Sequence, residues 1–289
     1  NFNPDEQNAC RPAGGGWQGP LLERSGLDLL ADRELMALGA FQSSGFRIGS
    51  NSWVVGPSLS PSGRPVVAND PHLDVRVLPG PWYPSGLITP SFRAVGVAIP
   101  GVPGMAVGRT ERIAVGVTNS YADGQDLFIE TVDPGNPEHY LEGKESLPFQ
   151  LLIERIRIKD PESAEGFREE EVIIRLTKRG PVVSGRFQGL ESTKVLSLRW
   201  SPFESMAPSL GLDGLLRART VHDVRESLRQ VTMIMLNFVF ADVEGQFGWQ
   251  TTGRVPIRAR GNGLVPTPVT DGKNDWTGWI PYDQMPQAY

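Results

Sequence analysis

Short apolar segments separated by turn residues dominate the chain from residue 51 onward. Alternating runs rich in β-branched residues predict strands at 52–55, 65–68, 92–99, 112–117, 127–132 and 195–200. Residues 148–158 and 170–177 alternate with charges on one face, which indicates a long hairpin or a two-sided sheet. Residues 237–249 predict a second hairpin with Glu244 and Gly245 at its turn.

Helical spacing is confined to fewer segments. It predicts helices at about 207–218 and 220–231, the second opened by Thr220 as N-cap. Residues 21–41 carry leucines at helical spacing, interrupted by Gly26, and predict one broken helix between a spacer at 1–20 and a short linker at 42–49. Because strands outnumber helices, the pattern favours an α+β fold with sheets stacked face to face.

Composition narrows the class of protein. The 289 residues suffice for one large domain or two modest ones. With 39% hydrophobic and 21% charged residues and a net charge of −5, the chain is neither disordered nor a basic nucleic-acid binder. The single cysteine, Cys10, excludes an intramolecular disulfide and a multi-cysteine metal site. The longest apolar run, 231–241, is too short for a membrane span. Residues 1–20 have no signal-peptide core, so we expect a chain that starts in mid-protein.

Common catalytic motifs are missing from the sequence. It contains no HExxH, P-loop or nucleotide-binding glycine motif, and no GxSxG nucleophile elbow. Of the three histidines, we expect His139, in the turn 136–138, and His222, on a polar helix face, to lie at the surface. An enzyme with this sequence must therefore activate its nucleophile in another way.

Three segments stand out by their order and spacing. They are Gly49-Ser50-Asn51, Asn69-Asp70-Pro71-His72, and 116–119 followed by the acidic stretch 123–126. Each alone is typical of a turn. Together they resemble the penicillin acylase family, which includes acyl-homoserine-lactone acylases and cephalosporin acylases. The segments 100–104, 113–130, 237–245 and 276–281 extend the resemblance from about residue 35 to the C-terminus.

The resemblance implies a fold and a division of the chain. The fold is that of N-terminal-nucleophile hydrolases, an αββα sandwich of stacked antiparallel sheets, which we expect to be incomplete here. Residues 1–49 correspond to the end of the upstream chain with its linker, and 50–289 to the first part of the catalytic domain.

The implied activity is hydrolysis of linear amides to a carboxylic acid and an amine. Side chains of penicillins, cephalosporins or N-acyl-homoserine lactones are the family's substrates. The resemblance also implies a heterodimer with the remainder of the precursor, no catalytic cofactor, and a periplasmic or extracellular location. The alternative is an inactive, unprocessed fragment or a non-catalytic relative with a β-rich interaction role.

In this family the precursor cuts itself before a serine, which becomes the nucleophile; the match is Ser50. Gly49 has no side chain to block the hydroxyl, and the released α-amine, with a pKa of about 7.7–8, can serve as general base. The family's oxyanion hole corresponds to the side-chain amide of Asn237 and the backbone N–H of Asn119. Asn237 also interrupts an apolar run, where an amide is costly unless paired. The other interpretation is an asparagine satisfied by local backbone.

Three further assignments follow from the resemblance. His72 corresponds to a residue whose backbone carbonyl or side chain contacts the nucleophile's amine; the alternative is a core histidine after a turn. Arg258 matches a family arginine near that amine and the substrate, with Arg254 and Arg260 as competitors. Asp123, the carbonyl of Gln125, and Asp126 match part of a structural calcium site, since oxygen ligands suit a hard cation. A further acidic ligand comes from the upstream chain in the family. An Asx-rich turn is the alternative.

Overall fold

The structure is a computed structural model that describes residues 49–73, 80–186, 194–207, 210–269 and 273–289. The predicted spacer 1–20, the helix 21–41, most of the linker and Cys10 lie outside the described residues. Among the described residues, no helix is long and apolar enough to cross a membrane.

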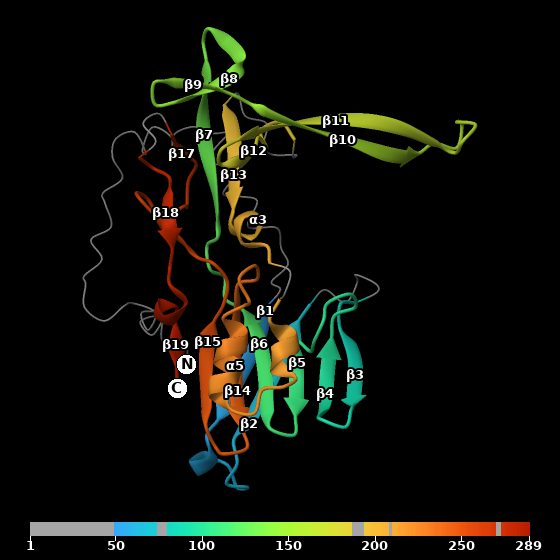
Figure 1. The fold of residues 1–289 in the computed structure, drawn as a ribbon, viewed down its shortest axis with the longest axis vertical. Helices are drawn as coiled ribbons and strands as arrows, with labels where there is room; N and C mark the ends of the chain where they lie inside the picture. The colour runs from blue at the N-terminus through green and yellow to red at the C-terminus, as the bar shows by residue number, and fades with distance from the viewer. Residues whose placement is uncertain (1–48, 74–79, 187–193, 208–209, 270–272) are drawn as a thin grey trace.

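A seven-stranded antiparallel sheet forms the centre of the lower part of the molecule in Figure 1. Its strand order is β19-β15-β14-β6-β5-β4-β3. The strands are β3 (Tyr83–Ile88), β4 (Arg93–Ala98), β5 (Val107–Thr110), β6 (Ile113–Asn119), β14 (Leu236–Asp242), β15 (Phe247–Thr251) and β19 (Gln287–Ala288).

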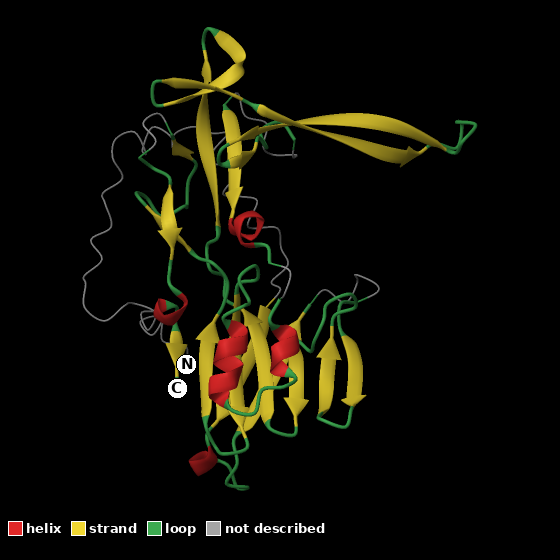
Figure 2. Cartoon of the chain, in the orientation of Figure 1, coloured by secondary structure: helices red, strands yellow, loops and turns green. Residues whose placement is uncertain are grey.

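One face of this sheet is covered by the helices α4 (Leu212–Leu215) and α5 (Val221–Leu228), drawn in red in Figure 2. Alternate side chains of β6 and β14, such as Val117 and Phe238, point into a core that they share with both helices. Phe238 and Leu228 are fully buried there. Burial of each such side chain contributes about 1.5–3 kcal/mol, so this core fixes the positions of β6 and β14.

The other face carries a hairpin of β1 (Gly49–Val55) and β2 (Val66–His72), joined through the 3-10 turn η3 (Pro57–Leu59). Gly116 of β6 permits the close approach, because a Cβ there would lie 2.7 Å from Ser52 Oγ and 3.0 Å from Asn69 Cβ. The Asn69 side chain bridges the layers: it donates to the carbonyls of Asn51 (2.9 Å) and Val117 (2.7 Å). The lower part therefore has three layers: helices, sheet and hairpin.

The upper part is built on β7 (Gln125–Asp133), which directly continues the chain from β6. It pairs with β13 (Val195–Trp200), β8 (Asn136–Glu142) and, in parallel, β17 (Thr267–Pro268); β8 in turn pairs with β9 (Glu145–Pro148). The hairpin of β10 (Gln150–Lys159) and β11 (Phe167–Thr177) projects as a long arm in Figure 1 and ends at β12 (Gly180–Pro181). The short helix α3 (Ser201–Ser205) follows β13. The strand β16 (Pro256–Arg258) pairs with β18 (Trp276–Trp279). The 3-10 turn η4 (Tyr282–Gln284) follows β18.

The sheet-rich architecture with few helices agrees with the predicted α+β class. Both predicted hairpins are present, and Gly245 has the positive φ of 93° expected at the β14–β15 turn. The predicted helix at 207–218 is wrong in extent: α4 is only four residues long. Gly211, with φ of 70°, precedes it and Gly214 lies within it. The position of His139 is also corrected, since it lies on strand β8 rather than in a turn.

Candidate active site

The Ser50 side chain faces the large sheet. Ser52 contacts the Gly116 position of β6, and residues two apart on a strand share a face. Ser50 therefore points toward the large sheet as well, while Asn51 and Trp53 on the opposite face are exposed. The predicted nucleophile, the second residue of β1, thus lies between the two β-layers.

The same register places Ser50 beside the start of β14. Ser52 lies over Gly116, and the Asn69 side chain joins Asn51 to Val117. The strand β1 therefore runs antiparallel to β6 in the neighbouring layer. Continuing this register puts Ser50 over Thr118. Thr118 pairs with Asn237 in the sheet. Because Phe238 faces the helices, Asn237 faces the hairpin layer and so lies on the same side as Ser50.

The Asn237 amide is held in one orientation. Its Oδ1 accepts from Trp249 Nε1 at 3.2 Å and from Thr251 Oγ1 at 2.9 Å. Its Nδ2 makes only long contacts, 3.5 Å to Thr118 Oγ1 and 3.4 Å to the Asn119 carbonyl. Since bonds of this length are weak, the N–H groups of Nδ2 retain donor capacity for a ligand.

The Asn119 backbone N–H is directed away from β14. Ser120 N–H donates to the Met235 carbonyl at 3.3 Å, so the next pair, Asn119 and Leu236, is of the non-hydrogen-bonded kind. The Leu236 N–H accordingly points away from β6 and donates to Thr252 Oγ1 at 3.3 Å. The Asn119 side chain accepts from Tyr121 N–H at 2.8 Å, which fixes the turn after β6.

His72 ends β2 directly opposite Gly49. Its Nε2 is paired with Asp70 Oδ2 at 2.7 Å, and its Nδ1 lies 3.8 Å from where a Gly49 Cβ would be. Both groups are about half exposed. The alternative interpretation of His72 as a core histidine is therefore wrong, and the ring lies beside Gly49 on the outer face of the hairpin, opposite to the face that carries Ser50.

Arg258 lies in a different cluster, in the upper part. Its Nε donates to Asp126 Oδ2 at 2.8 Å, and its Nη2 lies 3.0 Å from Asp123 Oδ2. Trp276 Nε1 also donates to Asp126, which is 6% exposed. Burial raises the pKa of the Asp123 carboxyl, and the neighbouring Arg258 guanidinium opposes that shift.

This pairing bears on the predicted calcium site. Among the described residues, no group of three or more acidic, histidine or cysteine side chains is arranged to hold a metal. The carboxylates of Asp123 and Asp126 both pair with Arg258. A calcium ion with an additional ligand stays a prediction.

Several residues that shape the site were not found from sequence. Asn69 looked like a turn residue, yet it lies within β2 and fastens the hairpin to β6. Trp249 and Thr251 orient Asn237 from the neighbouring strand. Once the hairpin 237–249 is predicted, the pairing of Asn237 with residue 251 follows from its register, so a signal for Thr251 was present. The sequence offered no such signal for Asn69, because its partner lies 48 positions away.

Four of the predicted catalytic residues therefore come together at one end of the lower part: the start of β1, the ends of β2 and β6, and the start of β14 (Figure 1). The sequence profile of a family described as penicillin amidase matches residues 2–289. The chain belongs to the penicillin amidase family. Arg258 and the acidic pair form a separate group in the upper part.

Individual relatives agree with this membership. The chain is 34% identical over 254 residues to acyl-homoserine lactone acylase QuiP of Pseudomonas aeruginosa, covering 82% of this chain and 29% of that protein. It is 34% identical over 276 residues to penicillin acylase 2 proenzyme of Pseudomonas sp. strain SE83, covering 92% and 34%. The structure matches penicillin G acylase from Alcaligenes faecalis with a TM-score of 0.63 and 25% identity, covering 73% of this chain and 37% of that one. The chain thus spans about a third of the length of these relatives.

Proposed function

We propose that this penicillin amidase family protein is a hydrolase of linear amides whose nucleophile is Ser50, made N-terminal by cleavage of the Gly49–Ser50 bond. The observation that supports the proposal is the packing of β1 against β6 at Gly116, together with the register of β6 and β14, from which we infer that Ser50 faces the oriented Asn237 amide. The names of the relatives, an acyl-homoserine lactone acylase and a penicillin acylase proenzyme, support it.

The first step is self-cleavage. The Ser50 hydroxyl attacks the Gly49 carbonyl carbon, the peptide C–N bond breaks, and an ester joins Gly49 to Ser50 Oγ. Water then hydrolyses that ester, which leaves a carboxylate on Gly49 and frees both the hydroxyl and the α-amine of Ser50. A glycine at this position leaves the carbonyl open to attack.

The freed amine then acts as the general base. Its reference pKa is about 7.7–8, so a modest decrease makes it largely neutral near pH 7. It takes the proton of its own hydroxyl while Oγ attacks the substrate's acyl carbon, and the proton passes to the leaving amine. Water repeats the attack on the acyl-enzyme and releases the carboxylic acid. We infer from the family resemblance that the His72 backbone, which pairs with residue 49 in the uncut chain, accepts a hydrogen bond from the α-amine.

Negative charge on the acyl oxygen requires fixed donors. Asn237 Nδ2 is oriented by two bonds to its Oδ1, and the Asn119 N–H is directed away from β14. We infer that these two groups form the oxyanion hole. A donor that is already oriented needs no reorganisation during the reaction, and loss of one such donor typically lowers turnover by about 100- to 1,000-fold.

We further infer the complete αββα sandwich, in which a second helical layer covers the outer face of the β1–β2 hairpin. Trp53 and Val66 on that face are 52% and 48% exposed, which supports a covering layer. The acyl substrates of the relatives, penicillins and acyl-homoserine lactones, are proposed as the substrate class. A periplasmic or extracellular location is likewise proposed, from the family resemblance.

The test is hydrolysis of chromogenic acyl amides, with phenylacetyl and fatty acyl groups of increasing length, by the native gene product. Wild-type protein should release the chromogenic amine, and Ser50→Ala should lower that rate to background. Ser52→Ala is the matched control: this serine lies on the same strand and face, and we expect it to retain most of the activity. Equal activity of Ser50→Ala and wild type would overturn the proposal.

A further inference from the structure

The guanidinium of Arg258 lies where three oxygens of the acidic pair converge. Its Nη2 is 3.0 Å from Asp126 Oδ1, 3.0 Å from Asp123 Oδ2 and 3.1 Å from the Asp123 carbonyl oxygen. Its Nε donates to the second carboxylate oxygen of Asp126 at 2.8 Å. Two carboxylates and a carbonyl around one positive group are the kind of ligand set that hard cations use. Here that positive group belongs to the chain itself.

The carboxylate of Asp126 is fully paired without any bound ion. It accepts three hydrogen bonds, two from Arg258 and one from the indole N–H of Trp276. Its side chain is 6% exposed and that of Arg258 is 13% exposed. A buried carboxylate is costly unless it is paired, and a two-point contact with a guanidinium is a strong form of pairing. The contacts of Asp126 therefore account for its burial.

The backbone at Gly263 closes over the same pair. Gly263 has a φ of 77°, and a Cβ there would overlap Asp126 Oδ1 and lie 2.6 Å from Asp123 Oδ2 and 2.8 Å from Arg258 Nη2. Residue 263 thus packs directly against both carboxylates and the guanidinium. A calcium ion takes about six to eight oxygen ligands at about 2.3–2.6 Å. The backbone at Gly263 occupies part of the space that further ligands would need.

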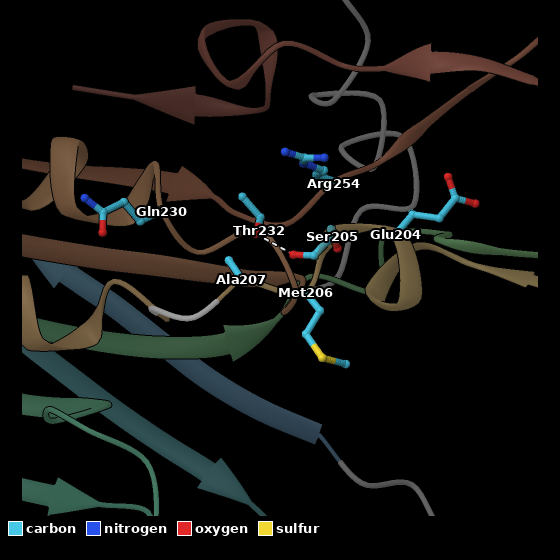
Figure 3. A pocket seen from close by; sticks show the side chains of 7 residues that line it. All are labelled: Glu204, Ser205, Met206, Ala207, Gln230, Thr232 and Arg254. Carbon is cyan, nitrogen blue, oxygen red and sulfur yellow. Dashed lines mark hydrogen bonds between the residues drawn. The ribbon is translucent and has the colours of Figure 1, made fainter.

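The other two arginines of this segment are placed differently. Arg254 lines a separate pocket beside the end of α3 (Figure 3), and its guanidinium lies 5.9 Å from the centre of the Trp279 ring. Arg260, two residues after Arg258, is exposed. Of the three arginines that the sequence offers here, Arg258 is the one that the acidic pair holds.

We propose that Arg258 is the protein's own cation at Asp123 and Asp126, in place of the calcium ion that the family resemblance implies there. The contacts fit the guanidinium better than a calcium ion, because the oxygens are already bonded to it and Gly263 lies against them. The acidic pair then requires no bound ion for its stability. This inference does not depend on the proposed amidase function.

Calcium titration tests the proposal directly. The native gene product is freed of metal ions with EDTA and titrated with calcium chloride in a calorimeter, and its thermal unfolding is measured in EDTA and in millimolar calcium. A ion that binds only the folded state raises the unfolding midpoint. We expect the same midpoint in both buffers. Calcium binding by wild type that Asp126→Asn abolishes would overturn the proposal. A calcium response that Asp126→Asn leaves unchanged comes from another site and supports it.

Removal of the guanidinium supplies the second test. In EDTA, Arg258→Met should lower the unfolding midpoint by several degrees, because two neighbouring carboxylates lose their counter-charge. Asp126→Asn in the Arg258→Met background should restore part of that loss, since it removes one charge and keeps an acceptor for Trp276. Arg260→Met is the matched control and should unfold like wild type.

The variants have a defined contrary result. An Arg258→Met midpoint equal to that of wild type in EDTA would overturn the proposal. The calcium titration requires no change at Arg258, so it still decides if Arg258→Met does not fold.

Discussion

At the scale of single residues, the orientation of Asn237 connects packing to chemistry. Trp249 and Thr251 both donate to Oδ1, so the amide cannot turn over without losing two hydrogen bonds. The donor group Nδ2 consequently keeps one orientation. This arrangement also explains how a polar side chain is tolerated next to the fully buried Phe238.

Removal of this donor tests its role. Asn237→Ala should lower kcat for an acyl amide by about 100- to 1,000-fold with a small change in KM, because the donor acts mainly on the developing oxyanion. Thr251→Val keeps the donor but removes one of the two bonds that orient it, and we expect a smaller loss of about tenfold. Steady-state kinetics measure both variants. A kcat of Asn237→Ala within threefold of wild type would contradict the assignment.

The residues of the site differ in how far the sequence revealed them. Ser50 and Asn237 are predicted from the family resemblance, and Asn237 also from its place in an apolar run. Asn69 was misread because Asn-Asp-Pro is also a good turn, and only its contact with β6 identifies it as a bridge. The pairing of Arg258 with Asp126 joins residues 132 positions apart, a separation at which no local pattern carries information.

At the scale of elements, α5 shows a helix whose start is fixed locally. Thr220 accepts from Asp223 N–H at 3.2 Å, and Asp223 accepts from Thr220 N–H at 3.0 Å, which completes a capping box. Asp223 also accepts from Arg219 N–H at 2.9 Å. The Arg219 N–H, and after it Thr220, lower the pKa of the Asp223 carboxyl. The Thr220 cap was predicted from sequence because its signal lies within four residues.

A depressed pKa has a defined consequence for stability. Asp223 stabilises the fold fully above its unfolded pKa of about 3.9, and this contribution is lost as the pH falls through the lower folded pKa. The difference in unfolding free energy between wild type and Asp223→Asn should therefore be constant above about pH 5 and shrink below about pH 4. Thr220→Ala should cost about 1 kcal/mol at neutral pH. Urea denaturation at several pH values measures both; a pH-independent difference down to pH 3 would contradict the linkage.

Other elements could not be predicted, for physical reasons. The sequence of β3, Tyr-Pro-Ser-Gly-Leu-Ile, and that of β5, Val-Gly-Arg-Thr, have no apolar alternation, and pairing with β4 makes them strands. The helix predicted at 207–218 was overestimated because leucine spacing was given more weight than Gly211 and Gly214. By contrast, residues 148–158 and 170–177 were predicted as a long hairpin or a two-sided sheet, and β10 and β11 form the hairpin.

At the scale of the whole molecule, a buried ion cluster holds the upper part together. Arg179, 1% exposed, contacts Glu130 of β7 at 3.2 Å, Glu142 of β8 at 2.7 Å and Asp275 before β18 at 2.7 Å. Asp275 immediately precedes Trp276, which donates to Asp126 and so connects this cluster to Arg258. Nothing in the Lys-Arg-Gly turn distinguished Arg179 from an exposed turn residue.

Breaking this cluster should be costly. Arg179→Met leaves Glu130, whose side chain is fully buried, without its counter-charge, and we expect a loss of about 3–5 kcal/mol in unfolding free energy. Lys178→Met removes a partly exposed cation that contacts Glu142 and Asp275, and should cost no more than about 1 kcal/mol. Chemical denaturation compares the two. Equal losses for both variants would contradict the central role of Arg179.

The proposed mechanism depends on one covalent event, the creation of an N-terminal serine at position 50. Intact-mass analysis and N-terminal sequencing of the native gene product measure it directly. We expect a new chain that begins at Ser50 in wild type, and an uncut Gly49–Ser50 bond in Ser50→Ala. An uncut wild-type protein that still hydrolyses acyl amides would contradict the mechanism.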